Sequence, residues 1–256
     1  DVYKRQDAIR CLCTVWPDTA GRGAGITDTM SLVGLAMLIA LLSGAEDDAH
    51  ARHREPPQIR APGYSALQFE APTAGEYTLP PLGAAADGTV IDETGRALRL
   101  HDLYGDKITV LSFIYTSCPD VNGCPLAAFV LSQVQDRIMR NEQLAENTRL
   151  VSLSFDPRTD TPQVMQRYGN TFRADGFDWQ FLTTESEDRL QPILDDYDQS
   201  VIRDYDADGK YLGSISHILR VYLIDRSGQI RNIYSPSFLH ADILQADIET
   251  LLRDEP

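Results

Sequence analysis

The sequence is poor in cysteine, in long apolar runs and in positive charge, and each shortage excludes a class of protein. Four cysteines in 256 residues are too few for a disulfide-dense scaffold. No segment reaches the roughly 18 to 20 apolar residues that a full membrane span needs. The chain has 23 Lys+Arg against 38 Asp+Glu, a net charge of −15, so we expect no nucleic-acid partner.

The first part of the chain lacks the pattern of a folded domain. Residues 1–29 show no sustained apolar period, and we interpret them as an upstream extension or as no part of the native protein. After Met30, an apolar or small stretch runs from Leu32 to Leu42, and Ala49-His50-Ala51 has the form of a cleavage site. We therefore predict a signal peptide or short membrane anchor over residues 30–51, although no basic residue directly follows Met30.

A linker separates this leader from the folded part. Residues 52–74 are rich in Pro, Ala, Glu and Arg and show no apolar period, which predicts an extended, semi-rigid tether.

Strand and helix patterns alternate from Gly75 onward, as in an α/β protein. The predicted strands are Glu76–Pro80, a hairpin of Thr89–Ile91 with Ala97–Leu100, and the runs Lys107–Thr116, Arg149–Phe155, Phe177–Phe181 with Trp179 in the core, His217–Asp225 and Gln229–Tyr234. The predicted helices are Pro125 to about Arg140, one opened by Asp160-Thr161-Pro162, Glu185 to about Tyr197, and a C-terminal one marked by Leu239 to Leu252. This order predicts one α/β domain over residues 75–256, a thioredoxin-like fold whose central mixed sheet has helices on both faces.

Two cysteines stand where the first buried strand meets its helix. Reactive groups collect at the carboxyl ends of strands in such sheets, and Cys118 lies there. We place Cys124 at the N-cap, where the helix dipole and unpaired N–H groups stabilise a thiolate. Five residues separate the two, and they contain turn formers, so the loop can bring both sulfurs together. The pair could form a disulfide or share a metal; the alternative is two buried, inert cysteines.

His217 is the third candidate for the site. It precedes the apolar run Ile218–Ile224, and a strand antiparallel to Lys107–Thr116 would begin near the end of that strand. We therefore expect His217 within reach of the cysteine loop. Imidazole is a common metal ligand, but a lone histidine at a strand edge is more often a partly exposed polar residue.

Three motifs together resemble the Sco/SenC family. They are Tyr115-Thr116 … Cys118-Pro119-Asp120 … Cys124-Pro125, then Ser154-Phe155-Asp156-Pro157 … Asp160-Thr161-Pro162, and His217 before Val221-Tyr222-Leu223-Ile224-Asp225 … Gly228. The motifs come in the family's order, and the resemblance covers roughly residues 76–256. It implies a thioredoxin-like fold and a copper site formed by Cys118, Cys124 and His217.

The resemblance also implies a function and a place. The family is exported or membrane-tethered, so we expect this chain in the bacterial periplasm or on the outer face of the inner membrane, with residues 30–45 as the membrane tether. The implied function is that of a metallochaperone that delivers copper to, or reduces the cysteines of, the binuclear copper site of cytochrome c oxidase. Its partners would be the copper-site subunit of a respiratory oxidase or a related copper protein, and a thiol reductant.

The donor set agrees with copper. Two thiolates and one imidazole suit Cu(I), and Cu(II) is the second oxidation state of copper that we consider. A closed structural zinc site, in contrast, takes four ligands. The spacing departs from the family, which has three residues between its cysteines where this chain has five. That difference puts the sulfur–sulfur geometry and the usual client in question.

A second function of a different class needs only the cysteines. In a thiol–disulfide oxidoreductase, the more exposed thiolate of Cys118 and Cys124 would attack a client disulfide and the other would resolve the mixed disulfide. His217 discriminates between the two functions, because a redox protein without copper has no need of it.

Other polar features carry weaker signals. Asp204–Gly209 matches the first half of a calcium loop, but Ile215 stands where the closing glutamate is needed, so we predict a solvated acidic turn. Asp156 and Asp160 are expected in a turn and a helix cap. His101 and His240 receive no role.

Overall fold

The computed structural model describes residues 61–254, all of which lie in the second of two compact units of the chain, residues 55–256. The predicted leader over residues 1–51 and the start of the tether lie outside the described residues. In the described range, no helix has both the length and the apolar character needed to cross a membrane.

A six-stranded sheet forms the centre of the fold, in the order β1-β10-β9-β4-β5-β6. The strands are β1 Gly83–Ala84, β4 Ile108–Ile114, β5 Thr148–Ser154, β6 Trp179–Leu182, β9 Val221–Ile224 and β10 Gln229–Tyr234. β4, β5 and β6 are parallel, whereas β9 runs antiparallel to β4, β10 to β9, and β1 to β10. Every residue of β4 and β5 is buried, as expected for strands covered on both faces.

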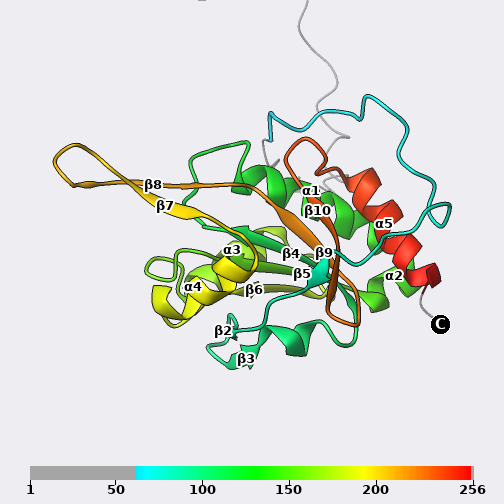
Figure 1. Cartoon of the computed structure of the whole chain (residues 1–256), viewed down its shortest axis with the longest axis horizontal. Coiled ribbons are helices and arrows are strands. Elements are labelled where there is room, and N and C mark those ends of the chain that lie inside the picture. The colour runs from blue at the N-terminus through cyan, green and yellow to red at the C-terminus, as the bar shows by residue number, and fades with distance from the viewer. Residues whose placement is uncertain (1–60, 255–256) are drawn as a thin grey trace, which may run out of the picture. The chain divides into compact units, whose positions relative to one another are not determined.

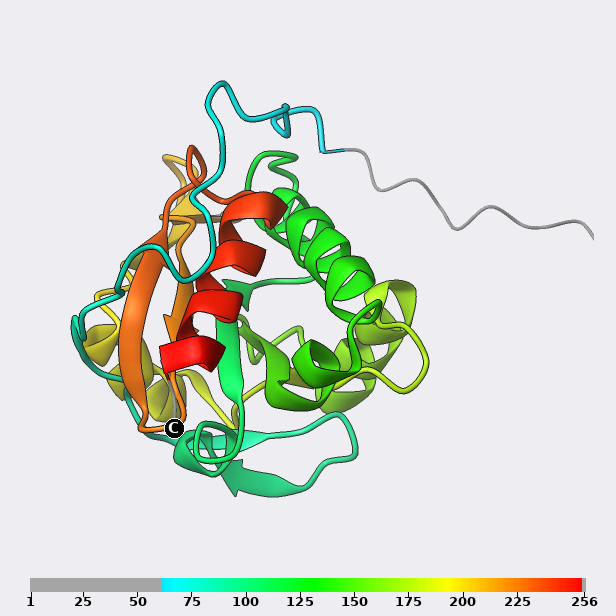
Figure 2. The same ribbon diagram turned by 90° about the vertical axis from the view of Figure 1, so that its right-hand side faces the viewer.

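Helices cover both faces of this sheet. They are α1 Cys124–Ile138, α2 Glu142–Asn147, α3 Pro162–Phe172, α4 Glu187–Asp196 and α5 Ala241–Asp254, with the short 3₁₀ helix η1 at Leu100–Leu103. Figure 2 shows α1 and α5 packed side by side on one face. α3 lies on the same face, where the ring of Phe172 contacts that of Trp179. The indole N–H of Trp179 donates to Ser152 Oγ, which is hydrogen-bonded to Ser112 Oγ of β4, so Ser112 points to this face as well. The predicted mixed sheet between two helical layers is therefore confirmed.

The other face is covered by the end of α4. Tyr197, at the C-cap of α4, packs with its ring 5.3 Å from that of Phe113 and 4.8 Å from that of Tyr222. Because side chains alternate along a strand, Phe113 points away from its neighbour Ser112 and hence away from α1 and α3. Trp179, buried in this structure, is a core residue as predicted.

Two small antiparallel pairs lie outside the main sheet. The predicted hairpin is present as β2 Thr89–Ile91 and β3 Ala97–Arg99. The second pair, β7 Val201–Tyr205 and β8 Tyr211–His217, forms a ribbon that projects from the body (Figure 1). The acidic segment predicted as a turn connects these two strands, with Gly209 at φ +79° and its N–H bonded to Asp206 O.

The structure differs from two of the predicted strand positions, one at the ribbon and one at the edge of the sheet. His217 does not begin the central strand but ends β8, and residues 218–220 separate it from β9. The segment Glu76–Pro80 is not a strand, because Pro80 and Pro81 cannot donate to a ladder; the edge is formed by β1 instead.

Asp160 lies in the turn after β5 and joins the ends of two parallel strands. Its buried carboxylate accepts hydrogen bonds from Thr116 N at 3.0 Å, from Thr116 Oγ1 and from Ser154 Oγ at 2.6 Å. Burial raises the pKa of Asp160, even though these hydrogen bonds oppose that shift. The expectation that Asp160 is a helix cap is wrong, because α3 is capped by Thr161, whose side chain accepts from Val164 N.

We predict that Asp160→Ala lowers the free energy of unfolding by about 3 kcal/mol, because it leaves a buried N–H and two hydroxyls without their acceptor. Asp160→Asn should cost less than about 1 kcal/mol, since an amide can accept from Thr116 N and donate to a hydroxyl. Guanidinium unfolding followed by circular dichroism measures both. Equal losses in the two variants would show that the hydrogen-bond pattern does not matter.

Candidate metal centre

Cys118 lies within the loop that connects β4 to α1, and Cys124 directly follows that loop. Gly123 is the N-cap of α1, Cys124 is its first residue and Pro125 follows, so the predicted N-cap position of Cys124 is wrong by one residue. The side chain of Cys124 is fully buried, and that of Cys118 is partly exposed. Both are free thiols.

The loop is folded tightly around the sulfur of Cys118. Cys118 Sγ lies 3.7 Å from Asp120 O, and Asp120 also accepts from Asn122 N at 3.0 Å and from Gly123 N at 3.0 Å. A Cβ atom at Gly123 would lie 3.3 Å from Asp120 O and 3.4 Å from Cys118 Sγ. The extra length of this loop is therefore used in a compact turn, and Gly123 leaves room for the sulfur.

His217 approaches the buried thiol from the ribbon. Its Nε2 lies 3.8 Å from Cys124 Sγ, and its Nδ1 lies 3.1 Å from Ile215 O. A carbonyl oxygen can only accept, so Nδ1 carries the proton and the lone pair of Nε2 faces the sulfur. This is the tautomer in which Nε2 can bind a metal while Nδ1–H holds the ring in place.

Two aromatic rings fix the plane of the imidazole. The ring of Phe155 lies 4.7 Å from that of His217, and the ring of Tyr115 lies 5.8 Å away in a T-shaped contact. The hydroxyl of Tyr115 accepts a hydrogen bond from Ile215 N at 3.3 Å, two residues before His217. The backbone N–H of Tyr115 donates to the same buried thiol, Cys124 Sγ, at 3.4 Å.

The two thiols differ in acidity. The hydrogen bond with the Cys124 thiol lowers the pKa of Cys118 to about 5, against the opposing effect of partial burial. The backbone N–H of Cys124, at the start of α1, adds to this shift. Burial raises the pKa of Cys124 well above its usual value, and a charge on Cys118 raises it further. Cys118 is thus the thiolate of the pair and Cys124 the thiol.

The structure brings the three predicted site residues into one neighbourhood. Cys118 is linked to Cys124 by a hydrogen bond, and Cys124 is in contact with His217. Among residues 61–254, no three or more His, Cys, Asp or Glu side chains already stand close enough to hold a metal ion. The three side chains are therefore neighbours but do not form a closed metal cage.

Sequence reasoning missed the residues that surround His217. Tyr115 and Phe155 belong to the motifs of the family resemblance, but nothing in their spacing shows that both rings contact one imidazole. Asp204, predicted in the acidic turn, lies instead in β7 and accepts from the hydroxyls of Ser214 and Ser216 across the ribbon.

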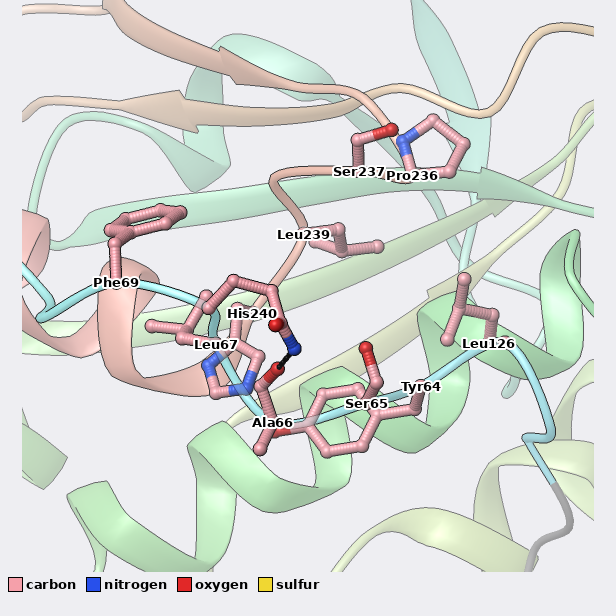
Figure 3. Close-up of a pocket in the computed structure, with 12 residues that line it drawn as sticks. Tyr64, Ser65, Ala66, Leu67, Phe69, Leu126, Pro236, Ser237, Leu239 and His240 are labelled. Atoms are coloured by element: carbon pink, nitrogen blue, oxygen red, sulfur yellow. Dashed lines mark hydrogen bonds between the residues drawn. The ribbon is translucent and has the colours of Figure 1, made fainter.

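A pocket lies apart from these residues, between the segment 63–69 and the loop 236–240 (Figure 3). Its volume is about 150 Å³, and the ring of Tyr64 stacks on that of His240 at 4.9 Å. Neither cysteine nor His217 lines it.

The chain is similar in sequence to proteins of a known family. The model of the SCO1/SenC family matches residues 84–253. The SCO2-like protein of Rickettsia typhi is 26% identical over 170 residues, which are 65% of this chain and 74% of that protein.

Solved structures show the same fold. Bradyrhizobium japonicum ScoI, solved with copper bound, has 25% identity and a TM-score of 0.51, over 64% of this chain and 99% of that chain. BsSco, described as having a disulfide switch and as a member of the Sco family of cytochrome c oxidase assembly proteins, has 20% identity and a TM-score of 0.55. That match covers 69% of this chain and 98% of BsSco. These neighbours confirm the thioredoxin-like fold.

We predict that iodoacetamide labels Cys118 and not Cys124 in the reduced, metal-free protein. At pH 5, the larger thiolate fraction of Cys118 outweighs the lower nucleophilicity of an acidic thiolate. The reaction should therefore be roughly 40-fold faster than that of an unperturbed cysteine. The rate should rise with pH through about 5 and then level off. Mass spectrometry of the peptide that contains both residues measures each site, with Cys118→Ser as the control. Equal labelling, or a rate that still rises above neutral pH, would contradict this order of acidities.

Proposed function

The chain belongs to the SCO1/SenC family, and from that premise we propose that it binds copper through Cys118, Cys124 and His217 and passes it to a respiratory oxidase. The observation that carries this proposal is the contact of His217 Nε2 with Cys124 Sγ, 3.8 Å apart, with Nδ1 hydrogen-bonded to Ile215 O. A histidine held in this tautomer against a thiol is arranged as a metal ligand. Its relative ScoI was solved with copper bound, and BsSco belongs to a family of cytochrome c oxidase assembly proteins.

The donor atoms favour Cu(I) as the cargo. Two thiolates and one imidazole nitrogen are soft to borderline donors, and with Cu(I) they form a site of net charge −1. The positive end of the α1 dipole, where Cys124 is the first residue, partly offsets that charge. Cu(II) would give a neutral site, but thiolates can reduce it.

The unequal exposure of the sulfurs suggests how the cargo leaves. Cys124 is buried, whereas Cys118 lies in a partly exposed loop. A thiolate of the recipient can therefore reach the ion from the Cys118 side and replace that ligand first. We propose the binuclear copper site of the oxidase as the recipient, a site whose own cysteines supply such thiolates, with a related copper protein as the other candidate.

The proposed place of action follows from the leader and the family. Residues 30–51 have the pattern of an export signal or a short anchor, so we propose that the domain works in the periplasm or on the outer face of the inner membrane.

One observation also favours thiol–disulfide exchange. An acidic, partly exposed thiol beside a buried one is the arrangement of a redox dithiol. The Cys118 thiolate would attack a client disulfide, forming a mixed disulfide and releasing one client thiolate. Cys124 would then attack Cys118 Sγ, giving the second client thiol and a Cys118–Cys124 disulfide. Such a reaction could prepare the recipient's cysteines, and a thiol reductant would restore the pair.

We predict one tight equivalent of Cu(I) in an anaerobic titration against bicinchoninate. The full chain is used with Cys11→Ser and Cys13→Ser, so that the remaining thiols are those of the site. His217→Ala should weaken binding more than about 100-fold, since loss of a ligand should exceed the loss caused by its supporting groups. Replacing both Cys118 and Cys124 by Ser should abolish it.

The matched control is His101→Ala, which removes an imidazole that bonds Ala85 O at 3.1 Å and should leave the affinity unchanged. If the parent chain does not compete for Cu(I), copper binding is wrong and the dithiol function remains. If His217→Ala binds as tightly as the parent, His217 is not a ligand.

A further inference from the structure

His217 is held on an element that the main sheet does not include. β7 and β8 pair only with each other in the described sheets, in the register Val201↔His217 and Arg203↔Ile215. The distance between His217 and Cys124 therefore depends on the side chains that hold this ribbon against the body. The ladder of the main sheet begins at β9, after residues 218–220, so it brings His217 near the cysteine loop but does not itself include it.

Arg203 makes ion pairs from the ribbon to the body. Its guanidinium donates to Asp156 Oδ1 at 2.6 Å and, through Nε, to Glu187 Oε1 at 2.9 Å. The side chains of Arg203 and Asp156 are only 16% and 3% exposed, so this ion pair is shielded from water. A shielded, forked arginine pair is both stronger and more directional than a surface salt bridge.

The residue that Arg203 contacts belongs to the turn that flanks the imidazole. Asp156 follows Phe155, whose ring lies 4.7 Å from that of His217. The carbonyl of Asp156 accepts from Thr159 N at 3.0 Å and from Asp160 N at 2.9 Å. Asp160 in turn holds Thr116, two residues before Cys118. One turn, residues 154–160, thus contacts both the ribbon that carries His217 and the strand that leads to the cysteines.

We propose that Arg203, through its ion pair with Asp156, is a positioning residue that holds His217 Nε2 against the buried thiol. This inference rests on the proposed function, because it concerns the third ligand of that site. The guanidinium of Arg203 contacts the turn and is not itself a ligand of the cargo. Because it pairs with Ile215 across the ribbon, fixing Arg203 fixes the strand two residues before His217.

The test is a double-mutant cycle on Cu(I) affinity, in the full chain that lacks Cys11 and Cys13. Arg203→Leu should weaken binding about 10- to 100-fold, the usual effect of removing a group that orients a ligand. In the His217→Ala background, the same change should have no further effect, because the ligand that it positions is gone. Arg203→Lys, which keeps the charge but not the fork, should recover part of the loss.

Two further variants separate positioning from general damage. Asp156→Asn keeps the shape of the partner, removes its charge and should weaken Cu(I) binding in the same direction, so it carries the test if Arg203→Leu does not fold. Arg158→Ala is the matched control, because Arg158 also pairs with Glu187 but is 67% exposed and should leave the affinity unchanged. Nitrogen NMR of His217 gives a readout without metal: the Nδ1–H tautomer should dominate in the parent and lose its dominance in Arg203→Leu.

The outcomes are distinct. If the parent chain binds no Cu(I), the proposed function fails before the inference is tested, and the histidine tautomer alone then decides whether Arg203 positions the ring. If the parent binds and Arg203→Leu binds equally well, the inference is wrong. It is also wrong if the loss is the same with and without His217, since Arg203 would then act on the whole fold.

Discussion

The carboxylate of Asp160 accepts hydrogen bonds from Thr116 and Ser154, at the ends of two neighbouring parallel strands, and this contact fixes where the cysteine loop leaves the sheet. The loop from Tyr115 to Gly123 can then be long, because both of its ends are held: one by Asp160 and the other by the first turn of α1. The same turn of the chain holds Arg203 through Asp156. The cysteine loop comes from the sheet and His217 comes from the ribbon, and both are therefore held by the same turn, residues 154–160. Neither the cysteines nor His217 belong to that turn.

The elements that the sequence predicts best are those in which burial leaves a local pattern. β4 and β9 are almost continuous apolar runs, and α1 and α5 have apolar stripes of helical period, so their positions are predicted within a few residues. β7 is not predicted, because Val201–Tyr205 places Arg203 and Asp204 in its middle and lacks a simple alternation. Its stability comes from a buried ion pair and from serine–aspartate contacts across the ribbon, which no local pattern reveals.

The site shows the same division. The grouping of Cys118, Cys124 and His217 could be predicted from strand order and from the family motifs. The position of His217 at the end of β8 could not, since it depends on pairing between Val201 and His217 across a turn of the ribbon. The roles of Asp156 and Asp160 also escaped prediction. Hydrogen bonds to residues more than 40 positions away leave no trace in local sequence.

The separate ribbon has a consequence for how the domain opens. Strands of one sheet open together, because each shares its ladder with a neighbour, whereas an element held by side chains alone can open by itself at a lower free energy. Amide protons of β8 should then exchange with solvent sooner than those of β9, although fewer than ten residues separate the two strands. With the proposed ligand set, opening of β8 alone would separate the imidazole from the cysteines while the main sheet stays folded, so loss of the metal would not require unfolding of the domain.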